Sequence, residues 1–133
     1  VALEEIGPLS RSATNPEKVS SICAVLAETD VINMVSRGIA TADILKGIHI
    51  SMATRLVKLL KVTGITKGTV LLTGGLALDA GLLAALQESL AAENVNLQAV
   101  SHPDSIYAGA IGAAIWGAFR HEKLAKRPDR IAA

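Results

Sequence analysis

The stretch VLLTGGLALDAGLLAAL, from Val70 to Leu86, decides the fold class of this chain. Its first residues belong to a short, unbroken apolar run from Thr69 to Thr73, which is typical of a strand buried on both faces. Gly74 and Gly75 follow this run as a turn, and we expect a helix from Leu76 or Leu78 to Leu90. The stretch therefore predicts a strand, a glycine turn and a helix.

The residues that follow continue the same alternation of strand and helix. Val95 to Val100 alternates as a second strand would, and the loop SHPDS leads into a final helix from about Ile106 to Lys126, which Pro128 ends. Strand, helix, strand and helix in this order are typical of an α/β fold with parallel strands, right-handed crossovers and packed helices.

The first half of the chain is expected to be helical. We predict a short helix from Ala2 to Leu9, a loop from Ser10 to Lys18 and a helix from Ala27 to Ser36. A longer helix should run from Ala42 to Thr63, with Thr41 as its cap and Gly64 just beyond its end. Its expected apolar stripe is Leu45, Ile48, Met52, Leu56, Leu59 and Leu60, with Arg55, Lys58 and Lys61 on the wetter side.

Composition limits the class of protein. A chain of 133 residues, half of them apolar, fits one compact domain, residues 1–133. A net charge of +1 and only three aromatic residues argue against nucleic-acid binding. The adjacent glycines and Asp79 argue against a membrane helix from Gly68 to Leu86. A single cysteine forms no internal disulfide and no targeting segment is visible, so we expect a cytoplasmic protein whose first residue lies inside a longer sequence.

Gly74 and Gly75 are the first candidate ligand contacts. Ligands of open parallel sheets bind beyond the carboxyl ends of the strands, which is where this turn falls. Glycine lets the backbone approach a ribose or a base closely, yet the same turn also serves as a simple packing device. The surrounding residues match neither a P-loop nor the G-x-G-x-x-G pattern, so both interpretations stay open.

The final helix is rich in small residues, including Ala108, Gly109, Gly112 and Gly117. So many glycines reduce helix propensity, which indicates that another element comes close to this face. One interpretation is close packing of the helix on the sheet. The other is that Ala108 and Gly109 border the same nucleotide pocket as the glycine turn.

The remaining chemistry-bearing residues form no constellation. Cys23 is interpreted either as a small buried hydrophobe or as a ligand to a metal cluster, whose other ligands would come from elsewhere. His49, His102 and His121 show no metal-ligand spacing and are expected to be surface or interface residues. Asp79 shows no catalytic geometry in the sequence, and no nucleophile stands beside a base.

Four segments together resemble the BadF/BadG/BcrA/BcrD ATPase family, which includes benzoyl-CoA reductase ATPase subunits and activators of 2-hydroxyacyl-CoA dehydratases. They are SSICAVLAETDVINMVSRG, GIHISMATRL, VLLTGGLALDAGLLAALQESL and YAGAIGAAIWG. The run C-x-V-x-A-E-[ST]-[DE]-V-I that begins at Cys23 is the most specific of these motifs. The segments DVIN and RGIATADILKGIHIS are similar in sequence to the benzoyl-CoA reductase subunits of the BadG/BcrD type.

The resemblance implies the ribonuclease H-like fold of actin, Hsp70 and sugar kinases, with this chain as an incomplete, C-terminal second domain of a two-domain subunit. It implies that Gly74, Gly75, Ala108 and Gly109 bind the adenosine of ATP. It implies that Cys23 is a ligand of a [4Fe-4S] cluster shared with a homologous ATPase subunit. Mg²⁺ in the full-length subunit, catalytic reductase subunits and ferredoxin as electron donor are implied as well.

The implied activity is the coupling of ATP hydrolysis to low-potential electron transfer for benzoyl-CoA ring reduction in anaerobic aromatic degradation. Asp79 departs from the asparagine expected in many relatives, and the phosphate loop and second cysteine of the family are absent, so this chain alone is not expected to hydrolyse ATP. Three alternatives stay open: a dehydratase activator, a sugar or carboxylate kinase domain of the same superfold, and a non-enzymatic association module.

Overall fold

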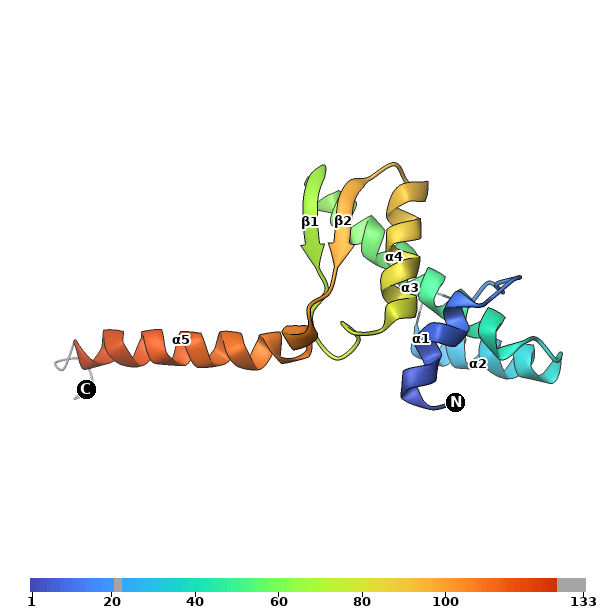
Figure 1. Cartoon of the computed structure of the whole chain (residues 1–133), viewed down its shortest axis with the longest axis horizontal. Helices are drawn as coiled ribbons and strands as arrows, with labels where there is room; N and C mark the ends of the chain where they lie inside the picture. The colour runs from blue at the N-terminus through green and yellow to red at the C-terminus, as the bar shows by residue number, and fades with distance from the viewer. Residues whose placement is uncertain (21–22, 127–133) are drawn as a thin grey trace.

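The computed structural model describes residues 1–20 and 23–126. Helices fill most of the chain, and two strands lie in its second half (Figure 1). In chain order the elements are α1 (Leu3–Arg11), α2 (Ala24–Ser36), α3 (Thr41–Val62), β1 (Lys67–Leu71), α4 (Ala80–Ala92), β2 (Asn96–Val100), the 3₁₀ helix η1 (Pro103–Tyr107) and α5 (Ala108–Ala125).

The two strands pair in parallel, as the sequence predicts. Lys67 lies opposite Asn96 and Leu71 lies opposite Val100. The amide of Leu72 then donates to the carbonyl oxygen of Val100 at 2.8 Å, so the two segments stay together just beyond the strands. Both strands therefore end at the same edge, next to the glycine turn.

The predicted burial of β1 on both faces is wrong. Four of its five residues are exposed, and Leu71 keeps 53% of its surface. Within the described residues β1 pairs only with β2, because the sheet has two strands. An apolar strand needs cover on each face to be buried, and these residues do not supply it.

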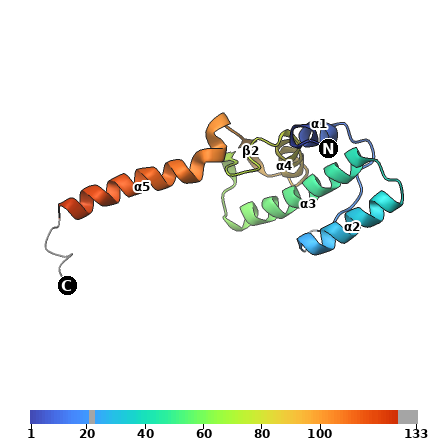
Figure 2. The ribbon, with the colours of Figure 1, turned by 90° about the horizontal axis from the view of Figure 1, so that it is seen from below.

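The main core lies between α3, α4 and β2. Its buried side chains are Ala53, Val57, Ala85, Leu86, Leu90, Leu97 and Ala99. A smaller cluster of Val19, Met34 and Ile44 joins α2 to the other face of α3. Figure 2 shows the result: α3 lies between α2 on one side and α1 with α4 on the other. The long helix is therefore the central support of the fold.

The buried face of α3 differs from the expected stripe. The buried residues are Ile44, Gly47, His49, Ala53 and Val57, whereas Leu59 keeps 59% of its surface. Small residues decide this face because they allow close approach: a Cβ added to Gly47 would lie 2.0 Å from the carbonyl oxygen of Glu17. A count of large apolar residues does not detect such contacts.

The two ends of α3 also test the sequence prediction. Thr41 is the first helical residue, not the cap; Ala40 occupies the cap position, and no side chain caps the helix there. Asp43 in the first turn instead accepts hydrogen bonds from the amides of Thr14 and Asn15, at 3.0 and 2.8 Å. Gly64, with a φ of +73°, follows the helix end as predicted.

Close packing of the final helix on the sheet is also wrong for this chain. Figure 1 shows α5 running away from the other elements, and none of its residues is buried. A Cβ added to Gly109, Gly112 or Gly117 would meet nothing within 4 Å. The predicted stop at Pro128 lies outside the described residues. Across the part of the chain that the structure describes, no helix combines the length and apolar character needed to cross a membrane.

Candidate functional site

The glycine turn lies at the carboxyl ends of both strands. Gly74 has a φ of +93°, a conformation that glycine adopts without the cost that a Cβ brings. Its amide donates to the carbonyl oxygen of Ser105 at 3.0 Å, which joins the turn to η1 directly before Ala108. A Cβ on the neighbouring Gly75 would meet nothing within 4 Å, so its backbone is open to a ligand.

A cavity of about 370 Å³ lies beside this turn. Its walls come from the segment that leads into α4 and from α1; the lining residues are Gly75, Leu76, Leu78, Asp79, Ala80, Leu3, Glu4, Gly7 and Pro8. The lining contains two carboxylates and no basic side chain, which suits an uncharged, hydrogen-bond-donating group better than a phosphate. Ala108 and Gly109 are not among the residues that line this cavity.

Asp79 lies where this cavity meets the start of α4. Its Oδ1 accepts hydrogen bonds from the amides of Gly81 and Leu82, at 2.8 and 3.0 Å, and so caps the helix. Its Oδ2 lies 3.2 Å from Nε2 of His49. Both oxygens of this carboxylate are thus held by the protein, through contacts with residues that are not predictable from the spacing around Asp79.

His49 is not the surface or interface residue that the sequence suggested. Only 5% of the residue is exposed, and Nδ1 lies 2.8 Å from the hydroxyl oxygen of Ser10 on α1. Because a carboxylate accepts but does not donate, Nε2 carries the ring proton, and Nδ1 accepts from the hydroxyl of Ser10. His102 and His121 are exposed, as expected.

Burial controls the protonation of His49. Removal from water lowers its pKa below the ordinary histidine value, although the Asp79 carboxylate acts in the opposite direction. Lys46 on the same helix lowers the pKa further. The ring fits against α4 because residue 81 is glycine: a Cβ there would lie 2.6 Å from Nδ1. The sequence showed a helix start at Asp79-Ala80-Gly81 but no sign that His49, 30 positions earlier, would lie against it.

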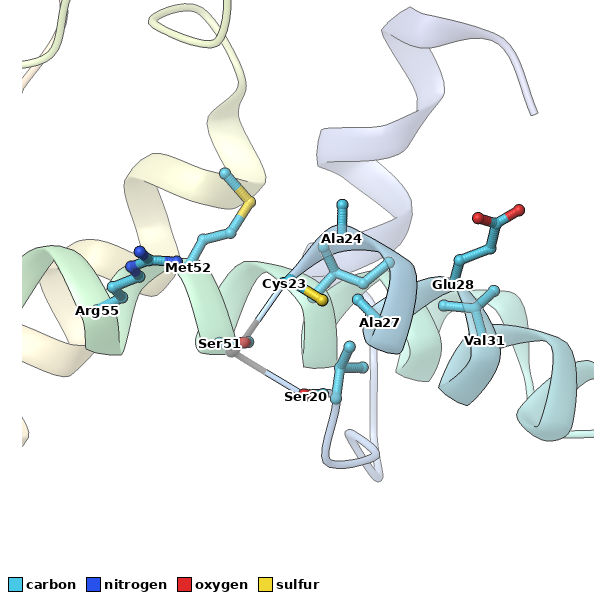
Figure 3. Close-up of a pocket in the computed structure, with 11 residues that line it drawn as sticks. Ser20, Cys23, Ala24, Ala27, Glu28, Val31, Ser51, Met52 and Arg55 are labelled. Carbon is cyan, nitrogen blue, oxygen red and sulfur yellow. The ribbon is translucent and has the colours of Figure 1, made fainter.

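Cys23 lies in a second cavity, of about 440 Å³, between α2 and α3. In the view of Figure 3, Cys23 stands at the start of α2, with Ser51 and Met52 of α3 on one side and Ala27 on the other. The cysteine is exposed, so its interpretation as a small buried hydrophobe is wrong. Its thiol is open to a ligand or to another chain.

The residues around Cys23 limit what metal chemistry this chain supports. Among the described residues, no three His, Cys, Asp or Glu side chains are grouped so that they could hold a metal ion. A typical [4Fe-4S] cluster needs four ligands, usually thiolates. Cys23 therefore fits such a cluster only as a single ligand, with the others supplied from outside these residues.

The two cavities are separate and lie on different sides of α3. Ile48, Ser51 and Met52 line the Cys23 cavity, while His49, between them in sequence, points to Asp79. The structure thus does not bring Cys23 and the glycine turn together. It connects them through one helix.

Comparison with solved structures defines the class of this fold. The activator of the 2-hydroxyisocaproyl-CoA dehydratase from Clostridium difficile, solved with bound ADPNP, matches with a TM-score of 0.75 at 31% identity, over 100% of this chain and 47% of that one. Component A of the Acidaminococcus fermentans (R)-2-hydroxyglutaryl-CoA dehydratase matches with a TM-score of 0.74 at 36% identity, over 87% and 42%. The chain has the α/β, ribonuclease H-like fold of the actin and Hsp70 class, as predicted.

The chain belongs to the BadF/BadG/BcrA/BcrD ATPase family, whose model matches residues 1–117. It is 69% identical to a subunit of the benzoyl-CoA reductase of Thauera aromatica over 126 residues, which cover 95% of this chain and 45% of that protein. It is 36% identical to the (R)-2-hydroxyglutaryl-CoA dehydratase activating ATPase of Acidaminococcus fermentans, with the same two coverages. The chain thus spans about half the length of the curated relatives it matches.

Proposed function

We propose that this chain is part of an ATPase subunit that couples ATP hydrolysis to low-potential electron transfer through a bridging [4Fe-4S] cluster, for benzoyl-CoA ring reduction. The identity of 69% with a benzoyl-CoA reductase subunit supports the choice of reaction. The observation that carries the coupling is α3, which faces the Cys23 cavity with Ser51 and Met52 and reaches the nucleotide side with His49.

In this proposal the glycine turn is the part of the chain that binds the nucleotide. Gly74 and Gly75 form one wall for the adenosine, and the cavity beside them is lined by carboxylates that accept hydrogen bonds from hydroxyl or amino groups. Ala108 and Gly109 do not line this cavity but follow η1, which the bond from the Gly74 amide to Ser105 holds beside the turn, and from there they contact the adenosine. Phosphate and Mg²⁺ contacts come from residues outside this chain.

The residue of this chain that would hold the cluster is Cys23, as a single thiolate ligand. Bound there, the cluster supplies one-electron transfer at a potential set by its surroundings. This chain contributes the thiolate and an apolar lining that includes Ala24, Ala27 and Val31. A shift of α3 would change that lining, because Ile48, Ser51 and Met52 belong to both the helix and the cavity.

The partners follow from the same proposal. A homologous ATPase subunit supplies further cluster ligands across a shared interface, catalytic reductase subunits receive the electron, and a ferredoxin donates it. We place the complex in the cytoplasm. The same partners require that Cys23 stay accessible at the surface of this chain, which it is.

The iron content of the native protein that carries this chain tests the cluster. Cys23→Ser should lower the iron and the cluster absorbance of the anaerobically purified protein, because an alcohol is a far weaker iron ligand than a thiolate. Ser51→Ala, which alters the same cavity without touching the thiol, is the matched control. Iron unchanged by Cys23→Ser would remove Cys23 from the site and favour the kinase alternative.

Calorimetric titration with ATP tests the nucleotide end. Gly75→Val should weaken ATP binding tenfold or more, because it adds a branched side chain at a residue that lines the cavity, where a Cβ meets nothing of this chain within 4 Å. Gly75→Ala, with one methyl group, should have a smaller effect. No binding of ATP by the native protein would favour the association module.

The second candidate function is activation of a 2-hydroxyacyl-CoA dehydratase. Identities of 36% and 33% with such activators support the same ATP chemistry with another partner. Reconstitution of the native protein with benzoyl-CoA reductase subunits or with a dehydratase separates the two. Turnover with the dehydratase and none with the benzoyl-CoA reductase subunits would replace the first proposal by the second.

A further inference from the structure

A buried polar chain runs from α1 through α3 to the start of α4. Ser10, 0% exposed, contacts Nδ1 of His49 at 2.8 Å, and Nε2 of His49 lies 3.2 Å from Asp79. Asp79 in turn holds the first amides of α4 and lines the cavity beside Gly75. Ser10 lies on α1 and Asp79 at the start of α4, the two parts of the chain that line this cavity, and His49 lies on α3, which packs against both helices.

We infer that His49 is a positioning residue for nucleotide binding: its Nε2–H holds the Asp79 carboxylate in the wall of the nucleoside cavity. The inference rests on the proposed function, since it concerns the same cavity. It assigns His49 a role that neither its own exposure nor a direct contact with the cavity would suggest, because His49 does not line the cavity.

The geometry favours this role over simple filling of the core. Filling of the core does not by itself require an imidazole, and a buried imidazole is costly unless both nitrogens are paired. Here both are paired, and one partner is a carboxylate whose side chain keeps 15% of its surface and lines the cavity. Nε2–H therefore fixes the orientation of a group that a bound nucleoside would meet.

Two substitutions of His49 test the roles of its two ring nitrogens separately. The amide of His49→Gln reaches as far as Nε2 and can donate to Asp79, whereas the shorter amide of His49→Asn reaches only Ser10. We expect calorimetric ADP affinity of the native protein within threefold of its original value in His49→Gln, and about tenfold weaker in His49→Asn. Melting curves of both variants report any general loss of folding.

The outcomes are distinguishable. Equal ADP affinity in the native protein, His49→Gln and His49→Asn, or equal weakening in both variants, overturns the positioning role. Absence of ADP binding in the native protein overturns the proposed function itself. The difference between the two variants, with similar melting temperatures, supports the inference.

A spectroscopic measurement keeps the inference testable if the His49 variants do not fold. The ¹⁵N resonances of His49 in the labelled native protein should report the Nε2–H tautomer, because Asp79 can only accept. In Asp79→Asn the amide donates to Nε2, and the proton should move to Nδ1. An Nδ1–H tautomer in the native protein, or no change in Asp79→Asn, would overturn the bond on which the role depends.

Discussion

The amide of Gly74 donates a 3.0 Å hydrogen bond to the carbonyl oxygen of Ser105, across 31 positions of the sequence. This bond joins the turn after β1 to the 3₁₀ helix after β2, at the edge where both parallel strands end. It therefore brings together the two segments, Gly74–Gly75 and Ala108–Gly109, that we propose for the adenosine.

The left-handed conformation of Gly74 leads to the first prediction. Gly74→Ala should destabilise the native protein by about 1–2 kcal/mol, because a Cβ at a φ of +93° is strained. Gly75→Ala, next in sequence and with open space around its Cβ, should change stability by less than about 0.5 kcal/mol. Urea unfolding measures both, and equal losses would contradict the assignment of strain to Gly74.

Asp79 caps α4 and pairs with His49, so its removal should affect two interactions. Asp79→Ala should cost about 2–4 kcal/mol, from the lost cap and from a buried N–H left without a partner. Asp79→Asn keeps an oxygen for the amides of Gly81 and Leu82 and should cost less than half as much. Denaturant midpoints compare the variants; a neutral Asp79→Ala would show that neither interaction matters for stability.

Gly81 contacts His49 closely, so replacing it by alanine should lower stability, although alanine has the higher helix propensity. Gly81→Ala should destabilise the protein by about 1–3 kcal/mol, because the new methyl would lie 2.6 Å from Nδ1 of His49 and 3.0 Å from Cβ of Ser10. Gly112→Ala, in the exposed α5, meets nothing within 4 Å and should be neutral or stabilise by up to about 1 kcal/mol. Thermal melting should therefore show a lower melting temperature for Gly81→Ala and an equal or higher one for Gly112→Ala.

The lowered pKa of His49 predicts a pH dependence of stability. The unfolded chain binds a proton near pH 6.5 that the native, buried ring binds less readily, so stability is complete above about pH 6.5 and is lost as the pH falls below it. His49→Gln should reduce the difference between urea midpoints at about pH 7.5 and pH 5.5. His121→Gln, at an exposed position, is the control and should leave that difference unchanged.

Most secondary structure was predictable from local patterns. The parallel strands, the helix after the glycine turn and the end of α3 before Gly64 follow from apolar periodicity and glycine position, which are properties of neighbouring residues. The motif around Cys23 and the glycine turn also sufficed to identify the family.

The burial of particular residues was not predictable in the same way. None of the large apolar residues predicted for the α3 stripe is fully buried, although Ile48 and Leu60 pack, partly buried, against the two core clusters. Gly47 and Gly81 instead admit a backbone and an imidazole that no pattern of hydrophobicity reveals. The expected burial of β1 and α5 failed for a related reason. An apolar pattern shows that cover is favoured, but not whether residues of this chain provide it.

The sequence by itself determined the order of helices and strands, the turn at Gly74 and the family, because these depend on composition and spacing along the chain. Only the tertiary structure decided that Cys23 is exposed and that Ser10, His49 and Asp79, 30 or more positions apart, form one buried chain. Such contacts depend on how three helices pack. That packing is set by small residues at points of close approach, whose partners lie far away in the sequence.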